Sequence, residues 1–76
     1  MKITDKEEWL ELVINYDACG TDAFDGMEIS DKQKEAVACA QRDMRHNEEA
    51  YGDKDADDFC EEAKSATYGW MKDFNA

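Results

Sequence analysis

Apolar residues near the amino terminus recur at the three- and four-residue spacing of a helix. At 100° per residue, their side chains cover roughly 200° of the helix circumference, which leaves Glu7, Glu8 and Glu11 on the remainder. A face this wide indicates that the helix packs between two others, or that part of it is kept for a partner. The apolar members are Trp9, Leu10, Leu12, Val13, Ile14 and Tyr16.

Both ends of this first helix carry sequence signals. Thr4 and Glu7 stand at the spacing of a capping box, in which the Thr4 hydroxyl accepts from the Glu7 amide. Gly20 offers a left-handed stop, so the predicted helix starts at Thr4 and runs to about Cys19. The residues that follow, Thr21 to Ile29, mix acids with isolated apolar residues and are predicted to form a structured loop.

A second capping box, Ser30 and Gln33, predicts a helix that runs to about Glu49 and ends at Tyr51 and Gly52. The third helix would be capped by Asp53 or Asp55, with acids in its first turn, where the helix dipole favours them. The apolar stripe of the second helix is Ala36, Val37, Ala40 and Met44, and that of the third is Ala56, Phe59, Cys60, Ala63, Ala66, Thr67, Trp70 and Phe74.

No segment shows the sustained alternation of a strand. The sequence therefore predicts an all-α fold, a single helical domain over residues 1–76 that forms a small antiparallel three-helix bundle. The predicted core is Trp9, Leu10, Val13, Val37, Met44, Phe59, Ala63, Trp70 and Phe74.

Acidic residues dominate the charge of the chain. Twenty Asp and Glu stand against nine Lys and Arg, which gives a formal net charge of -11. Nucleic-acid binding depends on clustered Lys and Arg, so direct contact with nucleic acid is disfavoured, and so is binding to an anionic membrane surface. Basic proteins, metal cations or solvent alone are left as partners.

The three cysteines, Cys19, Cys39 and Cys60, are odd in number and contain no C-x-x-C pair. This pattern favours reduced thiols over a disulfide framework. The residues after Met1 lack the apolar stretch of a signal peptide, and no run approaches transmembrane length. We therefore expect a cytoplasmic protein, in the cytoplasm of the host cell if a phage encodes it.

The candidate metal sites are incomplete, so no cofactor or metal is expected. Asp53, Asp55 and Asp57 fit the first positions of a calcium loop, but its sixth and twelfth positions are Asp58 and Lys64 where Gly and Glu are needed.

The remaining chemistry-bearing residues form no recognisable site. The segment 17–28 fits a calcium loop less well still, and His46, the single histidine, cannot complete a helical di-metal site. No Ser-His-Asp arrangement, thiol nucleophile with a His partner or glycine-rich phosphate loop is present. We expect no enzymatic activity.

Acidic side chains at helical spacing form a ladder on the predicted third helix, made of Asp53, Asp55, Asp57, Asp58, Glu61 and Glu62. Further acids lie on the first helix and in the loop after it, namely Glu7, Glu8, Glu11, Asp22, Asp25 and Glu28. In this respect the chain resembles, as a class, the small acidic proteins that bacteriophages and mobile elements use against host defences, of the anti-CRISPR and anti-restriction type. That resemblance implies an inhibitor, in some cases a DNA mimic, and it carries over no particular residue.

The leading hypothesis is a non-enzymatic inhibitor that docks on a basic, nucleic-acid-binding surface of a larger protein, such as a nuclease. Opposite charge would steer the association, and exposed aromatic residues would anchor it. The predicted acidic contacts are Asp55, Asp58, Glu61, Glu62, Glu8 and Glu11, and the predicted anchors are Tyr16, Phe24 and Tyr68.

Two alternatives stay open. In the first, the chain is a structural module that forms a homodimer through Trp9, Leu12 and Tyr16 of its first helix, while the acids keep it in solution. In the second, it binds a divalent cation, which would raise its melting temperature in the presence of calcium.

Overall fold

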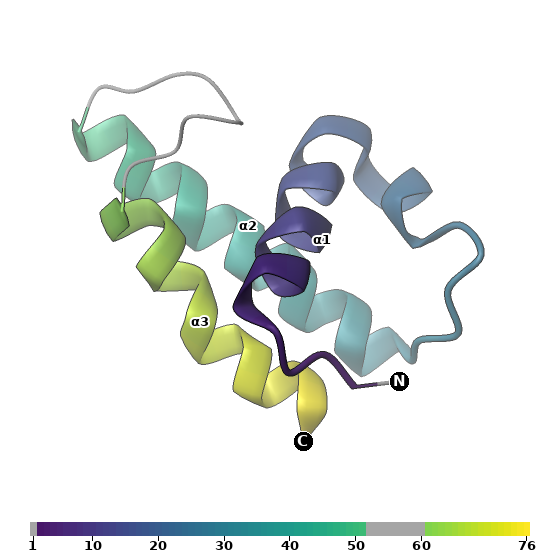
Figure 1. Cartoon of the computed structure of the whole chain (residues 1–76). Helices are drawn as coiled ribbons and strands as arrows, with labels where there is room; N and C mark the ends of the chain where they lie inside the picture. Colours follow the sequence, from purple (N-terminus) through teal and green to yellow (C-terminus); the bar gives the residue numbers. More distant parts are fainter. Residues whose placement is uncertain (1, 52–60) are drawn as a thin grey trace.

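Three helices and one short 3-10 helix make up the described part of the chain, which covers residues 2–51 and 61–76 of the computed structural model. They are α1 (Lys6–Cys19), the 3-10 helix η1 (Gly20–Phe24), α2 (Asp31–Tyr51) and α3 (Glu61–Asn75) (Figure 1). No strand occurs within these residues. The predicted all-α three-helix bundle is confirmed.

Helix α1 is capped one residue later than predicted. Asp5 has extended backbone angles, and its carboxylate accepts a hydrogen bond from the Glu7 amide at 2.9 Å, so Thr4 is not the cap. A carboxylate both accepts this bond and faces the positive end of the helix dipole, which favours Asp5 over the neighbouring hydroxyl. The predicted stop is confirmed, since Gly20 follows the helix with a φ of 65°.

The second capping box is present as predicted. The Gln33 amide donates to Ser30 Oγ at 3.2 Å, and the Ser30 amide donates to the Gln33 side-chain oxygen at 2.9 Å. These reciprocal bonds fix the start of α2 at Asp31. The predicted end agrees as well, because α2 extends to Tyr51.

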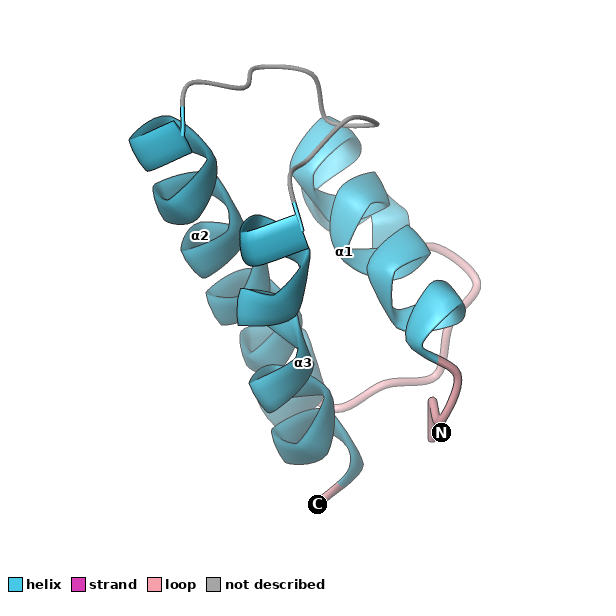
Figure 2. Ribbon diagram, turned by 60° about the vertical axis from the view of Figure 1, so that its left-hand side comes forward, coloured by secondary structure: helices cyan, strands magenta, loops and turns pink. Residues whose placement is uncertain are grey.

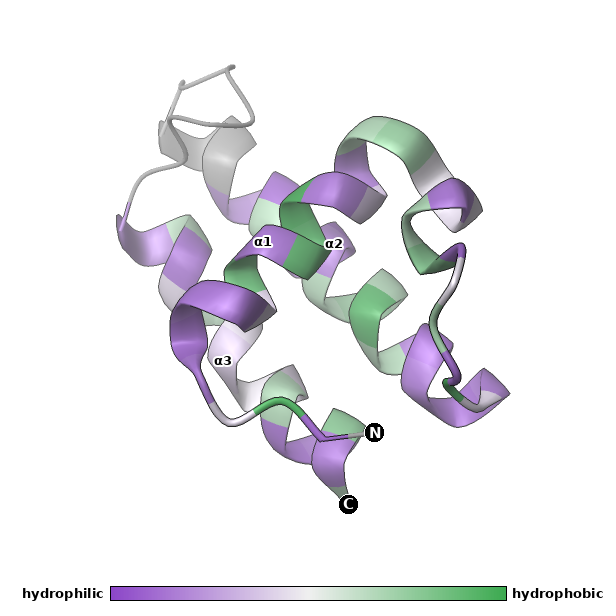
Figure 3. Ribbon diagram, turned by 45° about the vertical axis from the view of Figure 1, so that its right-hand side comes forward, coloured by the Kyte–Doolittle hydropathy of each residue, from purple (hydrophilic) through white to green (hydrophobic). Residues whose placement is uncertain are grey.

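Helices α2 and α3 lie side by side and run in opposite directions, and α1 packs across them (Figures 1 and 2). Hydrophilic residues dominate the first turns of α1 and α2, while hydrophobic residues gather where these helices face each other (Figure 3). Trp9 reaches to the centre of the molecule, where its ring meets Phe74 at 5.4 Å between centroids and its indole nitrogen donates to the Thr67 carbonyl at 3.0 Å. The buried core is Ile3, Trp9, Leu12, Val13, Phe24, Ala36, Val37, Ala40, Met44, Ala63 and Phe74.

Two predicted core residues, Leu10 and Trp70, are only half-buried. A third predicted core residue, Phe59, lies outside the described residues. The indole nitrogen of Trp70 instead donates to a carboxylate oxygen of Asp43 at 2.7 Å, which holds the ring at the edge of the α2–α3 contact. A polar partner near the surface explains why this large ring remains partly exposed.

The segment before α1 is fixed to the end of α3. The Ile3 amide donates to Asn75 Oδ1 at 2.8 Å, and Asn75 Nδ2 donates to the Ile3 carbonyl at 2.6 Å. One side chain thus satisfies both polar groups of the Ile3 backbone, while the Ile3 side chain enters the core. The extended amino-terminal segment is therefore part of the packed structure.

A partly buried ion pair joins the last turn of α1 to α2. Both Asp17 carboxylate oxygens accept from Arg45, at 2.7 and 2.6 Å, and Oδ1 also accepts from Gln41 Nε2 at 2.6 Å. The Asp17 side chain is only 3% exposed, whereas that of Arg45 is 41% exposed. Burial raises the pKa of Asp17, but the hydrogen bonds from Arg45 and Gln41 and the charge of Arg45 outweigh it, so the pKa lies below its ordinary value.

Candidate functional site

The solvent-facing side of α1 carries three carboxylates. Glu7, Glu8 and Glu11 are all exposed, and none of them forms an ion pair with another described residue. Because residues three and four positions apart are neighbours on a helix, Glu11 adjoins both of the other two. The first helix therefore presents a compact group of uncompensated negative charge, which we call the α1 acidic ridge.

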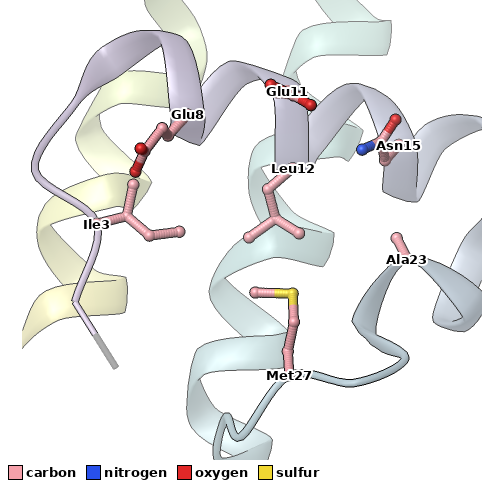
Figure 4. A pocket seen from close by; sticks show the side chains of 7 residues that line it. All are labelled: Ile3, Glu8, Glu11, Leu12, Asn15, Ala23 and Met27. Atoms are coloured by element: carbon pink, nitrogen blue, oxygen red, sulfur yellow. The ribbon is translucent and has the colours of Figure 1, made fainter.

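A hollow with an apolar floor lies on one side of this ridge. We call it the η1 hollow, because η1 and the turn after it form its far wall (Figure 4). Leu12 points across it toward Met27, Ile3 closes one end below the Glu8 carboxylate, and Asn15 lies above Ala23 at the other (Figure 4). Its volume is about 270 Å³, and its lining residues are Ile3, Glu8, Glu11, Leu12, Asn15, Ala23 and Met27.

A second hollow lies on the other side of the ridge, toward α3. Leu10 and Ile14, both half-buried, form its apolar part, and it measures about 310 Å³. Glu7 and Glu11 border it from α1, and Lys64 borders it from α3. We call it the Lys64 hollow. Glu11 thus stands between two apolar depressions.

The predicted acidic contacts fall into two groups. Glu61 and Glu62 are exposed in the first turn of α3 (Glu61–Asn75), and Glu8 and Glu11 are exposed on α1. Lys64 of α3 borders the same hollow as Glu7 and Glu11, whereas Glu8 borders the opposite hollow.

Two further predicted contacts, Asp55 and Asp58, lie outside the described residues, as does the candidate calcium loop that begins at Asp53.

The predicted aromatic anchors differ in exposure. Phe24 is only 7% exposed and packs against the Tyr16 ring at 5.3 Å between centroids, so its assignment as an exposed anchor is wrong. The 3-10 helix turns Phe24 inward beneath α1, which its place in a polar loop did not indicate. Tyr16 is half-buried by the same contact and keeps part of its ring accessible.

Tyr68 is half-buried on α3, with the Lys6 ammonium 4.8 Å from its ring centroid. Burial, and secondarily the negative charge of Glu61, raise the pKa of its hydroxyl above the ordinary value. This contact bridges the first turn of α1 and the middle of α3.

The dimer surface predicted as an alternative is not available, because two of its three residues are buried. Trp9 is fully buried and Leu12 is 7% exposed, so both are committed to the core of their own chain. Of the three predicted dimer residues, only Tyr16 reaches the surface. The excess width of the apolar arc instead corresponds to Leu10 and Ile14, which remain half-buried beside the ridge.

Other chemistry-bearing side chains are dispersed. Among the described residues, no three His, Cys, Asp or Glu side chains are grouped so that they could hold a metal ion. Cys19 is exposed, Cys39 is half-buried, and both are free thiols, while His46 is exposed on α2. In the alternative calcium loop over 17–28, the first carboxylate, Asp17, is already bound to Arg45.

None of the helices in the described ranges has both the length and the apolar composition that a membrane crossing requires. Comparison with protein-family models, with curated proteins and with solved structures found no match to this chain.

Proposed function

We propose that this protein is a non-enzymatic inhibitor that binds a basic, nucleic-acid-binding surface of a larger protein, and that the α1 acidic ridge is its main contact. The observation that carries the proposal is the exposure of Glu7, Glu8 and Glu11 on one helix, where no cation of residues 2–51 or 61–76 is paired to them. An unpaired surface charge is available to a partner without first breaking an internal contact.

The overall charge density supports this class of partner. Eleven net negative charges are distributed along a body whose longest dimension is 34 Å, or one charge per about 3 Å. Duplex DNA carries one charge per about 1.7 Å of its axis. A protein with about half the linear charge density of DNA can compete for a groove lined with Lys and Arg, and opposite charge speeds the encounter.

The ridge is also held rigidly. The opposite side of α1 supplies Trp9, Leu12 and Val13 to the buried core, so the helix cannot turn without exposing them. Asp5 fixes its first turn, and Asp17 ties its last turn to α2. A charged surface fixed in this way loses little conformational freedom on binding.

The test compares two triple variants with the same change in net charge. In E7Q/E8Q/E11Q the ridge is neutralised, whereas D31N/E35Q/D73N removes three exposed carboxylates from α2 and α3. Each tagged protein is used to capture partners from a lysate of the cell in which it is made, at low and at high salt. The affinity of the purified partner for each protein and for nucleic acid is then measured.

We expect a basic, nucleic-acid-binding partner whose affinity falls with salt and whose nucleic acid is displaced by the wild-type protein. Neutralising the ridge should weaken binding at least tenfold, a loss of about 1.4 kcal/mol, and should weaken it well beyond the control triple. Equal losses in the two variants would refute the role of the ridge. A partner that binds equally well at high salt, or that still binds nucleic acid in the complex, would refute the proposed function.

A further inference from the structure

The η1 hollow is one of two depressions with an apolar lining that border the α1 acidic ridge, and the one whose lining carries no cation. Its floor is formed by Leu12 and Ile3, which belong to the core, and by Met27, which is half-buried (Figure 4). Pockets that hold whole small ligands measure about 300 to 1,000 Å³, so a hollow of about 270 Å³ suits a single side chain better than a complete molecule.

The walls of the hollow are fixed from two directions. The Asn75 side chain holds the Ile3 backbone by two hydrogen bonds, and so sets one end wall. On the far side, the Met27 amide donates to the Phe24 carbonyl at 3.0 Å, and Phe24 itself is buried. Because hydrogen bonds hold these walls in place, the hollow needs little rearrangement to accept a side chain.

The rim of the hollow has a definite charge. Glu8 and Glu11 both border it, both are exposed, and no cation among the described residues lines it. A basic segment that approaches these carboxylates would therefore have an apolar depression directly beside its charged contacts. Charged contacts mainly steer and orient, whereas a buried apolar side chain supplies most of the lasting affinity.

We propose that the η1 hollow receives one aliphatic side chain, such as leucine or methionine, from a partner segment in which lysine or arginine flanks that residue. The flanking cations pair with Glu8 and Glu11, and the aliphatic side chain packs on Leu12 and Met27. This inference rests on the proposed function, and it adds to it the type of residue that anchors the complex.

The other possible occupants fit less well. In the Lys64 hollow, Lys64 would repel a basic segment, so that hollow is the poorer place for the same partner. A second copy of this chain would bring a further net charge of -11 and place like charges at the rim. The charge of the rim thus favours a basic partner over self-association.

The test uses two synthetic peptides of equal charge. One is an acetylated and amidated Lys-Lys-Leu-Lys-Lys, and the other has alanine in place of the leucine. Each is titrated into the full chain carrying isotope-labelled methionine methyl groups, and binding is followed by NMR. Met27 reports on the η1 hollow, while the buried Met44 and the α3 residue Met71 serve as internal controls.

We expect the leucine peptide to bind about five- to tenfold more tightly than the alanine peptide, because part of its additional aliphatic surface leaves water. Its titration should shift the Met27 methyl signal and leave those of Met44 and Met71 in place. Equal affinities, or an unmoved Met27 signal, would overturn this inference while leaving the acidic ridge intact. Failure of both peptides to bind would overturn the proposed function as well.

Two variants, each with one alanine replaced by leucine, test the site directly. Ala23→Leu fills the η1 hollow, and Ala18→Leu adds the same atoms at an exposed position of α1 that lines neither hollow. The first should abolish the preference for the leucine peptide and the second should retain it. A preference that survives in Ala23→Leu, or a Met27 signal that shifts with protein concentration alone, would contradict the assignment. If Ala23→Leu does not fold, the comparison of the two peptides on the wild-type protein still tests the proposal.

Discussion

The partly buried pair between Asp17 and Arg45 provides the sharpest test of how this small fold is held together. Replacing Asp17 by asparagine keeps the shape of the side chain but removes its charge, and it turns an amide donor toward the Arg45 and Gln41 donors. Breaking a buried ion pair from one side costs about 3 to 5 kcal/mol. Because the Arg45 side chain is 41% exposed and can regain water, we expect a loss at or below the lower end of that range, about 2 to 3 kcal/mol.

Such a loss is large for a chain of 76 residues, whose total stability is on the order of 4 to 11 kcal/mol. The assay is urea unfolding of D17N at pH 7, followed by circular dichroism and compared with D22N. Asp22 is exposed on η1, and its side chain makes no hydrogen bond within the described part of the chain, so D22N controls for the change in net charge. A double-mutant cycle with R45M isolates the pair and should give a coupling of about 1 to 3 kcal/mol.

The contribution of Asp17 to stability depends on pH. The pKa of Asp17 is lower in the folded chain than its ordinary value of 3.8, so its contribution is complete above that value and is lost as the pH falls through the folded pKa. The difference between the wild type and D17N should therefore shrink in strong acid. A D17N variant within about 0.5 kcal/mol of D22N at pH 7, or a difference that does not shrink at all as the pH is lowered below 3.8, would refute the reasoning.

Three further predictions concern the remaining contacts. Asn75→Ala removes both hydrogen bonds to Ile3, so it should lower the free energy of unfolding by about 1 to 2 kcal/mol and speed hydrogen exchange of the Ile3 amide. An unchanged exchange rate would contradict the role of Asn75 in holding Ile3. Salt screens the self-repulsion of a net charge of -11, so the melting temperature in calorimetry should rise with sodium chloride, and a fall would contradict this account. Glu61→Gln should lower the pKa of Tyr68 in an ultraviolet titration, whereas the same change at Glu62, which does not contribute to that shift, should have a smaller effect.

The features that the sequence predicted well depend on neighbours along the chain. Helical spacing, the Ser30 and Gln33 capping box and the Gly20 stop all act within one or two turns, and the structure contains each of them. The choice between Thr4 and Asp5 as the first cap could not be made in the same way. Both residues can cap a helix, and the position of Ile3, fixed by Asn75 from the far end of the chain, bears on where α1 begins.

The features that the sequence missed depend on distant contacts. Asp17 and Arg45 are 28 positions apart, so no local spacing relates them. The predicted exposure of Phe24 is wrong because Tyr16 and the core cover its ring. The η1 hollow likewise forms only because the fold brings together Ile3, Leu12 and Met27, which are distant in sequence. The over-wide apolar arc of α1 was the one local sign that some of its residues remain accessible.

The proposed function and the stability of α1 make opposite demands at Glu11. Glu7 and Glu8 lie in the first turn, where the helix dipole stabilises them, but Glu11 lies beyond it and adjoins both of these like charges. Glu11→Gln should therefore stabilise the fold by a few tenths of a kcal/mol, measured by urea unfolding, while it weakens binding to the basic partner. A residue whose removal improves the fold and impairs the complex serves the partner, not the core. Loss of stability together with loss of binding would instead assign Glu11 to the architecture of the helix.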